Sequence, residues 1–239
     1  MQALLSFVFR PVLEIDTMKI EIQNITKHFR NKQVLSGASF SAVSGQCIGI
    51  LGSNGCGKST LLSILAGVLP CDSGAFLYEG KDLFAFRRQR AELVGYVPQG
   101  TPLIEELTTY DNLLLWYDKK QLTQELQNGV LKMLGVGDFL KVPVSKLSGG
   151  MKKRLSIGCA IAKHPPILLL DEPMAALDFV CKQQISQYLT EHKQKGGILI
   201  LVTHDVQELA LCDTCYILKG GVLAPYDYTG NIDELVEKL

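Results

Sequence analysis

The chain has 239 residues, of which 47% are hydrophobic and 20% are charged, and its formal net charge is +0. This length suits one large α/β domain, and the composition excludes a disordered chain. The balanced charge gives no electrostatic reason to expect a nucleic-acid partner. An odd number of cysteines, 7, without a regular spacing indicates a reduced chain rather than a disulfide-built secreted one.

The segment before Met18 is the least regular part of the sequence. It lacks the basic start and the small-residue cleavage site of a signal peptide. Neither this segment nor any other apolar run reaches the roughly 18 residues of a membrane span. We expect residues 1–17 to be an accessory N-terminal extension or an over-long start, and residues 18–239 to form a single domain.

Three strands and a helix are predicted in the first part of this domain. Met18 to Ile25 alternates apolar and polar residues, as a half-buried strand does, and Val34 to Phe40 is a second strand. We expect an N-terminal antiparallel β part here. Cys47 to Leu51 is a short apolar run that enters a glycine turn, which is typical of a buried strand, and Lys58 to Val68 has the apolar spacing of a helix.

The remainder predicts a parallel sheet interrupted by helices. Val94 to Val97 is a strand stopped by Pro98, and the segment from about 101 to 162 is mainly helical, with candidates at Leu107 to Trp116, Leu122 to Leu134 and Gly149 to Ala162. Strands and helices then alternate, at Ile167 to Leu170, Val180 to Lys193, Ile198 to Val202, Val206 to Cys212, Tyr216 to Leu218 and Ile232 to Leu239. This alternation predicts an α/β fold with a mostly parallel sheet flanked by helices, and the segment 101–162 as an inserted helical subdomain.

A phosphate-binding loop is predicted between the strand at Cys47 to Leu51 and the following helix. Its sequence, GSNGCGKST, completes the pattern GxxxxGK[ST] in the strand–turn–helix context that this motif requires. Glycines let backbone N–H groups surround a phosphate, a lysine adds positive charge, and a serine hydroxyl suits Mg²⁺. The candidate ligands are Gly52, Ser53, Asn54, Gly55, Cys56, Gly57, Lys58, Ser59 and Thr60. Alone, the motif fits a kinase or a GTPase equally well.

An acidic pair follows the strand at Ile167 to Leu170. Asp171 and Glu172 come at its carboxyl end, where α/β sheets bind ligands. A carboxylate such as Asp171 suits Mg²⁺, and Glu172 can accept a proton from an attacking water. In isolation the pair is also compatible with an ordinary polar turn at the end of a strand.

A second anion-binding element is predicted at the sequence LSGG. Ser148 can cap the helix that follows, Gly149 and Gly150 allow close approach, and the helix N-terminus attracts anions. An ordinary capped helix start has the same features. With this element in place, the chain from Met18 to about Leu223 resembles the ABC ATPase family, through GSNGCGKST, Gln99, LSGG, ILLLDEP, the sequence AALD and His204 in that order.

The resemblance implies a role for each matching residue. Phe29 corresponds to the aromatic residue that stacks on adenine, and Gln99 to a residue near Mg²⁺ and the attacking water. Asp178 corresponds to an aspartate that communicates across a dimer, and His204 to a histidine that contacts the γ-phosphate. Ser59, Gln99 and Asp171 are the implied Mg²⁺ site. Lys58, Gln99, Glu172 and His204 are the implied catalytic set for hydrolysis of ATP.

The resemblance also implies partners and a location. Ser148, Gly149 and Gly150 would close over the ATP of a second ABC ATPase protomer, identical or homologous, in a head-to-tail pair. An integral membrane permease subunit would dock on the helical segment near Thr101 to Tyr117, which places the chain on the cytoplasmic face of the cell membrane. The sequence MKKR after LSGG is similar to that of some exporter subunits of the ABC-2 type.

Other interpretations remain open at this point. A soluble ABC ATPase that acts on a non-transport machine is the main alternative, although the chain carries one ATPase unit and no sustained heptads. A GTPase is disfavoured because no NKxD sequence is present, and a non-hydrolysing module is disfavoured because Glu172 and His204 are both present. Cys212 and Cys215 form a CxxC pair, which is either half of a redox or zinc site or two small residues at a helix–strand junction.

Overall fold

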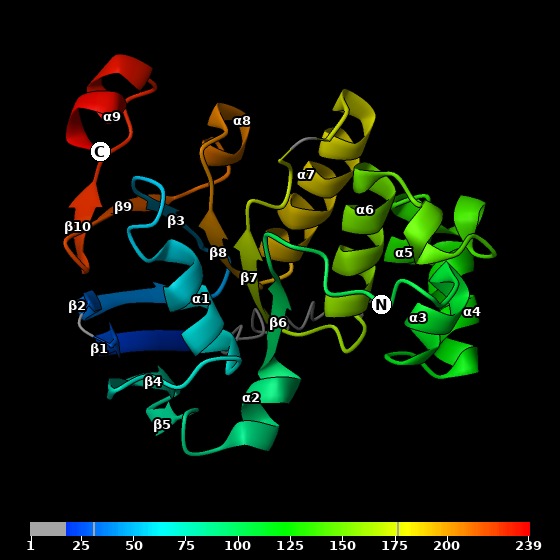
Figure 1. Ribbon diagram of the computed structural model, residues 1–239, viewed down its shortest axis with the longest axis horizontal. Coiled ribbons are helices and arrows are strands. Elements are labelled where there is room, and N and C mark those ends of the chain that lie inside the picture. Colours follow the sequence, from blue (N-terminus) through cyan, green and yellow to red (C-terminus); the bar gives the residue numbers. More distant parts are fainter. Residues whose placement is uncertain (1–17, 31, 176) are drawn as a thin grey trace, which may run out of the picture.

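The computed structural model describes residues 18–30, 32–175 and 177–239, so the predicted extension at residues 1–17 lies outside the described part (Figure 1). Within that part, no helix has both the length and the apolar character needed to cross a bilayer.

The centre of the molecule is a six-stranded sheet with the order β10-β9-β3-β8-β7-β6. Its strands are β3 (Cys47–Leu51), β6 (Val94–Val97), β7 (Ile167–Asp171), β8 (Ile198–Val202), β9 (Thr214–Lys219) and β10 (Val222–Tyr226). The pairs are parallel except that β10 runs antiparallel to β9. Every residue of β3, β7 and β8 is buried, which explains why these strands are continuous apolar runs.

A second, antiparallel sheet has the order β2-β1-β4-β5. It comprises β1 (Lys19–Phe29), β2 (Lys32–Val43), β4 (Ser73–Tyr78) and β5 (Lys81–Asp82). In β1 the buried residues Ile20 and Ile22 alternate with more exposed ones, because one face of this sheet packs on the core. A hydrogen bond from Ser36 N to Gly221 O, 2.8 Å long, joins the antiparallel sheet to the turn between β9 and β10.

Helices cover the central sheet and extend the molecule at the side of β6 and β7 (Figure 1). They are α1 (Lys58–Ala66), α2 (Arg87–Leu93), α3 (Thr109–Leu114), α4 (Lys119–Asn128), α5 (Val130–Met133), α6 (Gly149–Ala160), α7 (Phe179–Gln194), α8 (Val206–Leu209) and α9 (Ile232–Lys238). Short 3-10 turns at Val136–Phe139 and Val144–Lys146 lead into α6.

Two hydrophobic cores lie on opposite faces of the central sheet. Alternate residues of β7 face different cores, since Leu168 packs with α6 and α7 while Leu169 packs with α1 and the antiparallel sheet. A sheet buried on both faces and bordered by an antiparallel β part and a helical insertion is the predicted fold class, which is confirmed. The boundaries predicted for the helical subdomain, about 101–162, remain a prediction.

Several predicted elements differ in detail. The segment Leu122 to Leu134 is two helices, because the backbone at Gly129 is extended (φ −103°, ψ −161°) and the carboxylate of Glu125 accepts a hydrogen bond of 2.9 Å from Val130 N. Helix α8 ends at Leu209, three residues before its predicted end. Strands β4, β5 and β10 and helix α2 were not predicted from the sequence pattern.

Candidate functional site

The glycine-lysine loop connects β3 to α1 and is shaped by its glycines. The backbone of Gly57 is left-handed (φ 116°), and a Cβ atom there would lie 2.9 Å from the side chain of Val34. A residue other than glycine would therefore be both strained and crowded. Helix α1 starts at the next residue, Lys58, whose side chain is 6% exposed. Its Nζ donates to Gly52 O at 2.6 Å and to Ser53 O at 3.1 Å, so the loop encloses the ammonium group.

The acidic pair lies beside this loop at the end of β7. Glu172 has a left-handed backbone (φ 49°), which is uncommon for a residue with a side chain, and its N–H donates to Val202 O at 2.9 Å. This conformation re-aims the side chain relative to that of Asp171. The amide Nε2 of Gln99 donates to Glu172 Oε2 at 2.9 Å, and His204 Nε2 lies 3.8 Å from Glu172 Oε1. Three of the predicted catalytic side chains are thus brought together.

The oxygen atoms around Asp171 have the chemistry of a site for a hard cation. Burial raises the pKa of Asp171, and its hydrogen bond with the Ser59 side chain acts in the opposite direction. A hydroxyl and a carboxylate side by side, with a second carboxylate next in sequence, are ligands that Mg²⁺ prefers. The residues therefore fit the predicted Mg²⁺ site.

The surroundings of the histidine at the site favour its neutral form. Burial first, and then the positive charge of Lys58, lower the pKa of His204, while the carboxylate of Glu172 raises it. A neutral imidazole carries one N–H donor and one acceptor nitrogen. His204 can therefore donate a hydrogen bond from one ring nitrogen without adding a net charge to the site.

A cleft of about 770 Å³ collects the predicted residues from separate parts of the chain. Its lining comprises Phe29, Val34, Asn54, Gly55, Gly57, Lys58, Ser59, Thr60, Gln99, Glu172 and His204. The lining includes the exposed ring of Phe29 as well as acidic, amide and imidazole side chains. A cavity of this size with a cationic loop and an aromatic ring suits a ligand with phosphates and a flat base.

A second group of predicted residues does not line the cleft. Ser148 caps α6, and its Oγ accepts a hydrogen bond of 3.2 Å from Met151 N, as predicted. Asp178 caps α7, and hydrogen bonds from Cys181 lower the pKa of its carboxyl group. Gly149 and Gly150 form the first turn of α6. These residues mark two helix N-termini outside the cleft of the same protomer.

Two residues near the site were missed by the sequence interpretation. Val34 lines the cleft from β2, and nothing in its strand pattern distinguishes it from other apolar residues. Glu208 is 1% exposed, and its Oε1 accepts a hydrogen bond of 2.8 Å from Met174 N. Burial is the main cause that raises the pKa of Glu208 to about 7. One signal in the sequence could have identified Glu208. It is a charged residue four positions after His204, in a segment predicted to pack on the sheet.

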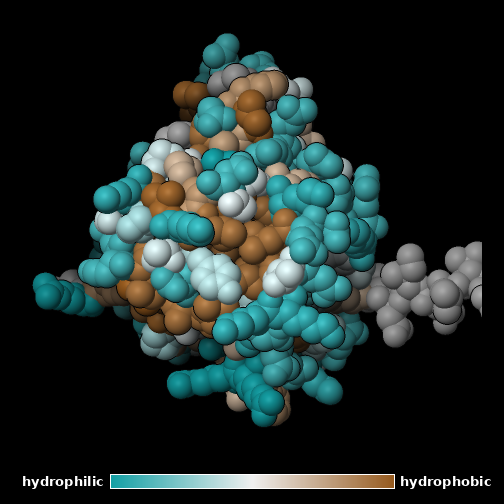
Figure 2. All heavy atoms as spheres, turned by 90° about the vertical axis from the view of Figure 1, so that its right-hand side faces the viewer, coloured by the Kyte–Doolittle hydropathy of each residue, from teal (hydrophilic) through white to brown (hydrophobic). Residues whose placement is uncertain are grey.

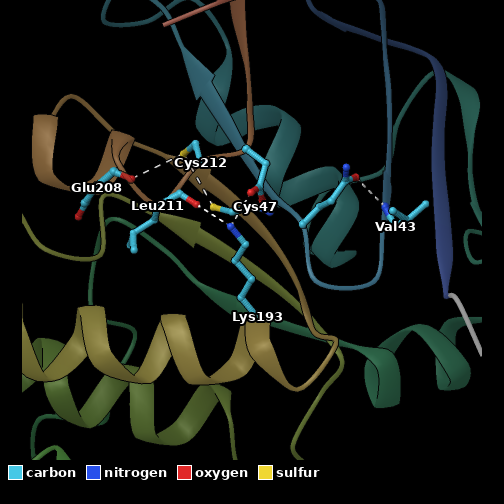
Figure 3. A network of polar contacts seen from close by, with 8 residues as sticks. Val43, Cys47, Lys193, Glu208, Leu211 and Cys212 are labelled. Carbon is cyan, nitrogen blue, oxygen red and sulfur yellow. Dashed lines mark hydrogen bonds and ion pairs between the residues drawn. The ribbon is translucent and has the colours of Figure 1, made fainter. Parts of the chain in front are cut away.

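The Cys212 and Cys215 pair lies at the junction between α8 and β9, as one of its two interpretations predicted. All 7 cysteines are free thiols. Figure 3 shows Cys212 facing Cys47, with the two sulfur atoms 3.8 Å apart, and the Cys212 thiol donates to Glu208 O at 3.6 Å. The neighbouring Lys193 Nζ donates to Leu211 O at 3.3 Å. These contacts tie the junction to β3 and α7.

The sequence of this chain matches a known protein family and has curated relatives. The sequence profile of the ABC transporter family matches residues 35–175. The chain is 36% identical over 210 residues to the Nod factor export ATP-binding protein I of Sinorhizobium fredii, covering 84% of this chain and 60% of that protein. It is 32% identical over 232 residues to a sulfate/thiosulfate import ATP-binding protein of Neisseria meningitidis serogroup A, covering 92% of this chain and 64% of that protein.

Solved structures agree with the sequence relatives. A protein described as the ATP-binding subunit of an ABC transporter has a TM-score of 0.78 and 26% sequence identity, with 92% of each chain covered. The chain spans about three fifths of the length of these two curated relatives. Together the profile match, the identity to these relatives and the shared fold show that this chain belongs to the ABC transporter family.

Proposed function

We propose that this protein is the ATP-binding subunit of an ABC transporter, which hydrolyses ATP to ADP and phosphate to drive transport through a separate membrane subunit. The observation that carries the proposal is the single cleft that joins the loop of Lys58 to Gln99, Glu172 and His204. These residues come from the ends of different parallel strands, where α/β sheets bind their ligands. Both curated relatives described above are named as ATP-binding proteins.

ATP would lie along the cleft with its base and phosphates at opposite ends. Phe29 is 44% exposed at the end of β1 and offers its ring face to adenine. The loop from Gly52 to Thr60 would bind the phosphates through its backbone N–H groups, with Lys58 as the positive charge. Mg²⁺ would be held by Ser59 and Asp171, close to Gln99, and would neutralise charge on the phosphate oxygens when bound.

Hydrolysis needs a group that accepts a proton from water beside the terminal phosphate. Glu172 Oε2 accepts a hydrogen bond from Gln99 and Oε1 lies 3.8 Å from His204 Nε2, so the carboxylate lies between these two side chains. In this proposal Glu172 takes the proton, and the amide of Gln99 orients the water. The ammonium of Lys58 and the neutral imidazole of His204 stabilise charge that develops on the γ-phosphoryl oxygens.

The helix tip at Ser148 to Gly150 would serve the ATP of a second protomer. Gly149 and Ser148 are exposed and do not line the cleft of their own chain. A head-to-tail pair with two-fold symmetry would place each tip over the partner's phosphate loop, and each protomer would give and receive the same contacts. Asp178, at the start of α7, is the proposed contact for communication across this pair.

The membrane subunit would dock on the helices at the side of the molecule away from the antiparallel sheet. Large apolar side chains are exposed there, with Ile104 at 45%, Leu115 at 58% and Trp116 at 55%. Figure 2 views the molecule from this side and shows a hydrophobic patch bordered by hydrophilic residues. Such patches on a surface mark interaction sites. We place the protein on the cytoplasmic face of the membrane, and the sequence Met151 to Arg154 favours export.

The substitution Glu172→Gln tests this function directly. It keeps the size of the side chain and removes the proton acceptor, so turnover should fall by about 100-fold or more while ATP binding persists. The variant should accumulate as an ATP-dependent dimer in gel filtration with Mg²⁺. The matched control is Lys58→Ala, which should lose ATP binding and stay monomeric. Near-normal hydrolysis by Glu172→Gln would refute the role of this residue.

A further inference from the structure

A buried lysine outside the predicted site connects helix α6 to the ends of two strands. Lys153 lies on α6 and is 5% exposed, although lysine is almost never fully buried unless it is paired. Its Nζ donates to two backbone oxygens, Pro98 O at 2.9 Å and Asp171 O at 3.4 Å. The ammonium group is therefore held by the main chain of two other segments.

Those two carbonyl groups lie where the parallel ladder ends. Strand β6 ends at Val97 and β7 ends at Asp171, and the last pair of their register is Val97 with Leu170. Beyond this point the backbone oxygens of the two strands need other partners. Lys153 supplies one donor group to both, so it fixes the two strand ends relative to each other.

The residues that follow these carbonyls are the ones that the proposed reaction uses. Gln99 follows Pro98, Glu172 follows Asp171, and their side chains are joined by the hydrogen bond of 2.9 Å. A small shift of either strand end would change the position of the amide or the carboxylate. Positioning errors of about 1 Å can cost around 100-fold in rate.

The charges around Lys153 favour its ammonium form against the effect of burial. Asp171, Glu208 and Glu172 act electrostatically to raise the pKa of Lys153, whereas burial, the larger effect, lowers it. A charged donor makes stronger hydrogen bonds to carbonyl oxygens than a neutral one. The same charge also offsets part of the repulsion between the carboxylates of Asp171 and Glu172.

We propose that Lys153 is a positioning residue for ATP hydrolysis, which holds the ends of β6 and β7 so that Gln99 and Glu172 keep their contact. This inference rests on the proposed function. Because α6 begins at Gly149, Lys153 also links the helix tip that serves one ATP of the dimer to the carboxylate that serves the other. Closure of the tip on a partner's nucleotide is thereby transmitted to the catalytic pair of the same protomer.

The experiment compares Lys153→Met with Lys152→Met. Lys152 is the adjacent residue on α6, but its Nζ pairs with Glu105 at 2.7 Å on the surface, away from both strand ends. Lys153→Met should lower kcat for ATP by about 30- to 100-fold, while KM and the affinity of the monomer for ATP change by less than about 3-fold. Lys152→Met should leave all three values unchanged.

A second measurement does not depend on turnover. Hydrogen exchange of the backbone amides of residues 99–101, Glu172 and Met174 should be about 10-fold faster in Lys153→Met than in wild type, and unchanged in Lys152→Met. Lys153→Arg, which keeps the charge, should recover part of kcat and of the exchange protection. Should the Met variant fail to fold, the comparison is made with Lys153→Gln.

Three results would overturn the inference. These are an unchanged kcat in Lys153→Met, unchanged exchange at both strand ends, or a loss of ATP affinity and thermal stability in proportion to kcat, which would indicate a purely structural role. Failure of the proposed function is a separate outcome, because wild-type protein and Lys152→Met would then show no ATP hydrolysis either.

Discussion

Glu208 shows how a single buried carboxyl group can affect the stability of the region behind the cleft. Its Oε1 accepts the hydrogen bond from Met174 N, just after the acidic pair, and it also bonds the side chain of Thr203, just before His204. The segments that carry Glu172 and His204 are therefore joined by one side chain. Burial disfavours the charged form of that side chain and is the main cause that raises its pKa to about 7.

This pKa predicts how stability changes with pH. The pKa of Glu208 in the folded protein, about 7, lies above the ordinary value of 4.5. Between these two values the folded state binds a proton that the unfolded state has lost, so the free energy of unfolding should fall as pH rises. The full effect corresponds to about 3 to 4 kcal/mol, at roughly 1.4 kcal/mol for each pKa unit. Glu208→Gln should remove this loss.

Urea unfolding at pH 5 and pH 8 measures the effect. The difference in unfolding free energy between the two pH values should be smaller in Glu208→Gln than in wild type. Each protein is compared with itself, so any constant cost of the substitution cancels. Glu237→Gln, which changes an exposed carboxyl group on α9, should keep the wild-type difference. Identical pH profiles for Glu208→Gln and wild type would contradict the assignment.

At the scale of elements, strand β3 contains a glycine, and two sulfur atoms fill the space where a side chain would lie. A Cβ atom at Gly49 would lie 2.8 Å from Cys212 Sγ and 3.0 Å from Cys215 Sγ. Both thiols belong to the junction between α8 and β9, and β9 pairs with β3 at Gly49 and Cys215. The CxxC pair therefore packs against the backbone of β3 at Gly49, where the absence of a side chain leaves room for the two sulfur atoms.

Gly49→Ala should accordingly destabilise the protein through this contact. Overpacking of a core typically costs about 1–3 kcal/mol, which we expect as a lower midpoint of urea unfolding. In a protein that also carries Cys212→Ala and Cys215→Ala the added methyl group has room, so the same change should cost less. Equal costs in the two backgrounds would show that the sulfur atoms are not the cause.

The elements that could be predicted from sequence are those whose burial leaves a simple pattern. Strands β3, β6 and β8 begin and end at the predicted residues, because short apolar runs with turn residues beside them have few alternatives. Helix α2 was missed because none of its residues is buried, so it has no apolar stripe. Strand β10 contains Pro225 and pairs on one side only, as an edge strand.

For the candidate site, sequence motifs identified residue types but not their connections. The loop of Lys58 and the pair Asp171 and Glu172 have fixed spacings, so they were visible as motifs. Lys153 and Glu208 act across long sequence separations, through backbone groups of Pro98 and Met174. A contact to a backbone atom places no constraint on the identity of the residue contacted, and only the folded chain brings such partners together.

At the scale of the whole molecule, the two predicted halves of the ATP site lie apart on one protomer. The cleft holds Lys58 and Glu172, whereas Gly149 is exposed at the tip of α6. A Cβ atom at Gly149 would meet nothing within 4 Å. Gly149→Glu should therefore fold normally, and a negative charge in the first turn of a helix is even favourable. In the proposed dimer, that charge would repel the phosphates bound by the partner.

Mixing two inactive variants tests this arrangement. Lys58→Ala and Gly149→Glu should each hydrolyse ATP poorly alone. In a mixed dimer, the intact Lys58 loop of one chain meets the intact Gly149 tip of the other, so one complete site is restored. Each mixed dimer holds one complete site out of two, so turnover should rise well above that of either variant alone, to at most about half of the wild-type value. Native mass spectrometry would verify that mixed dimers form. Mixed dimers as inactive as their parents would mean that each chain builds its site alone.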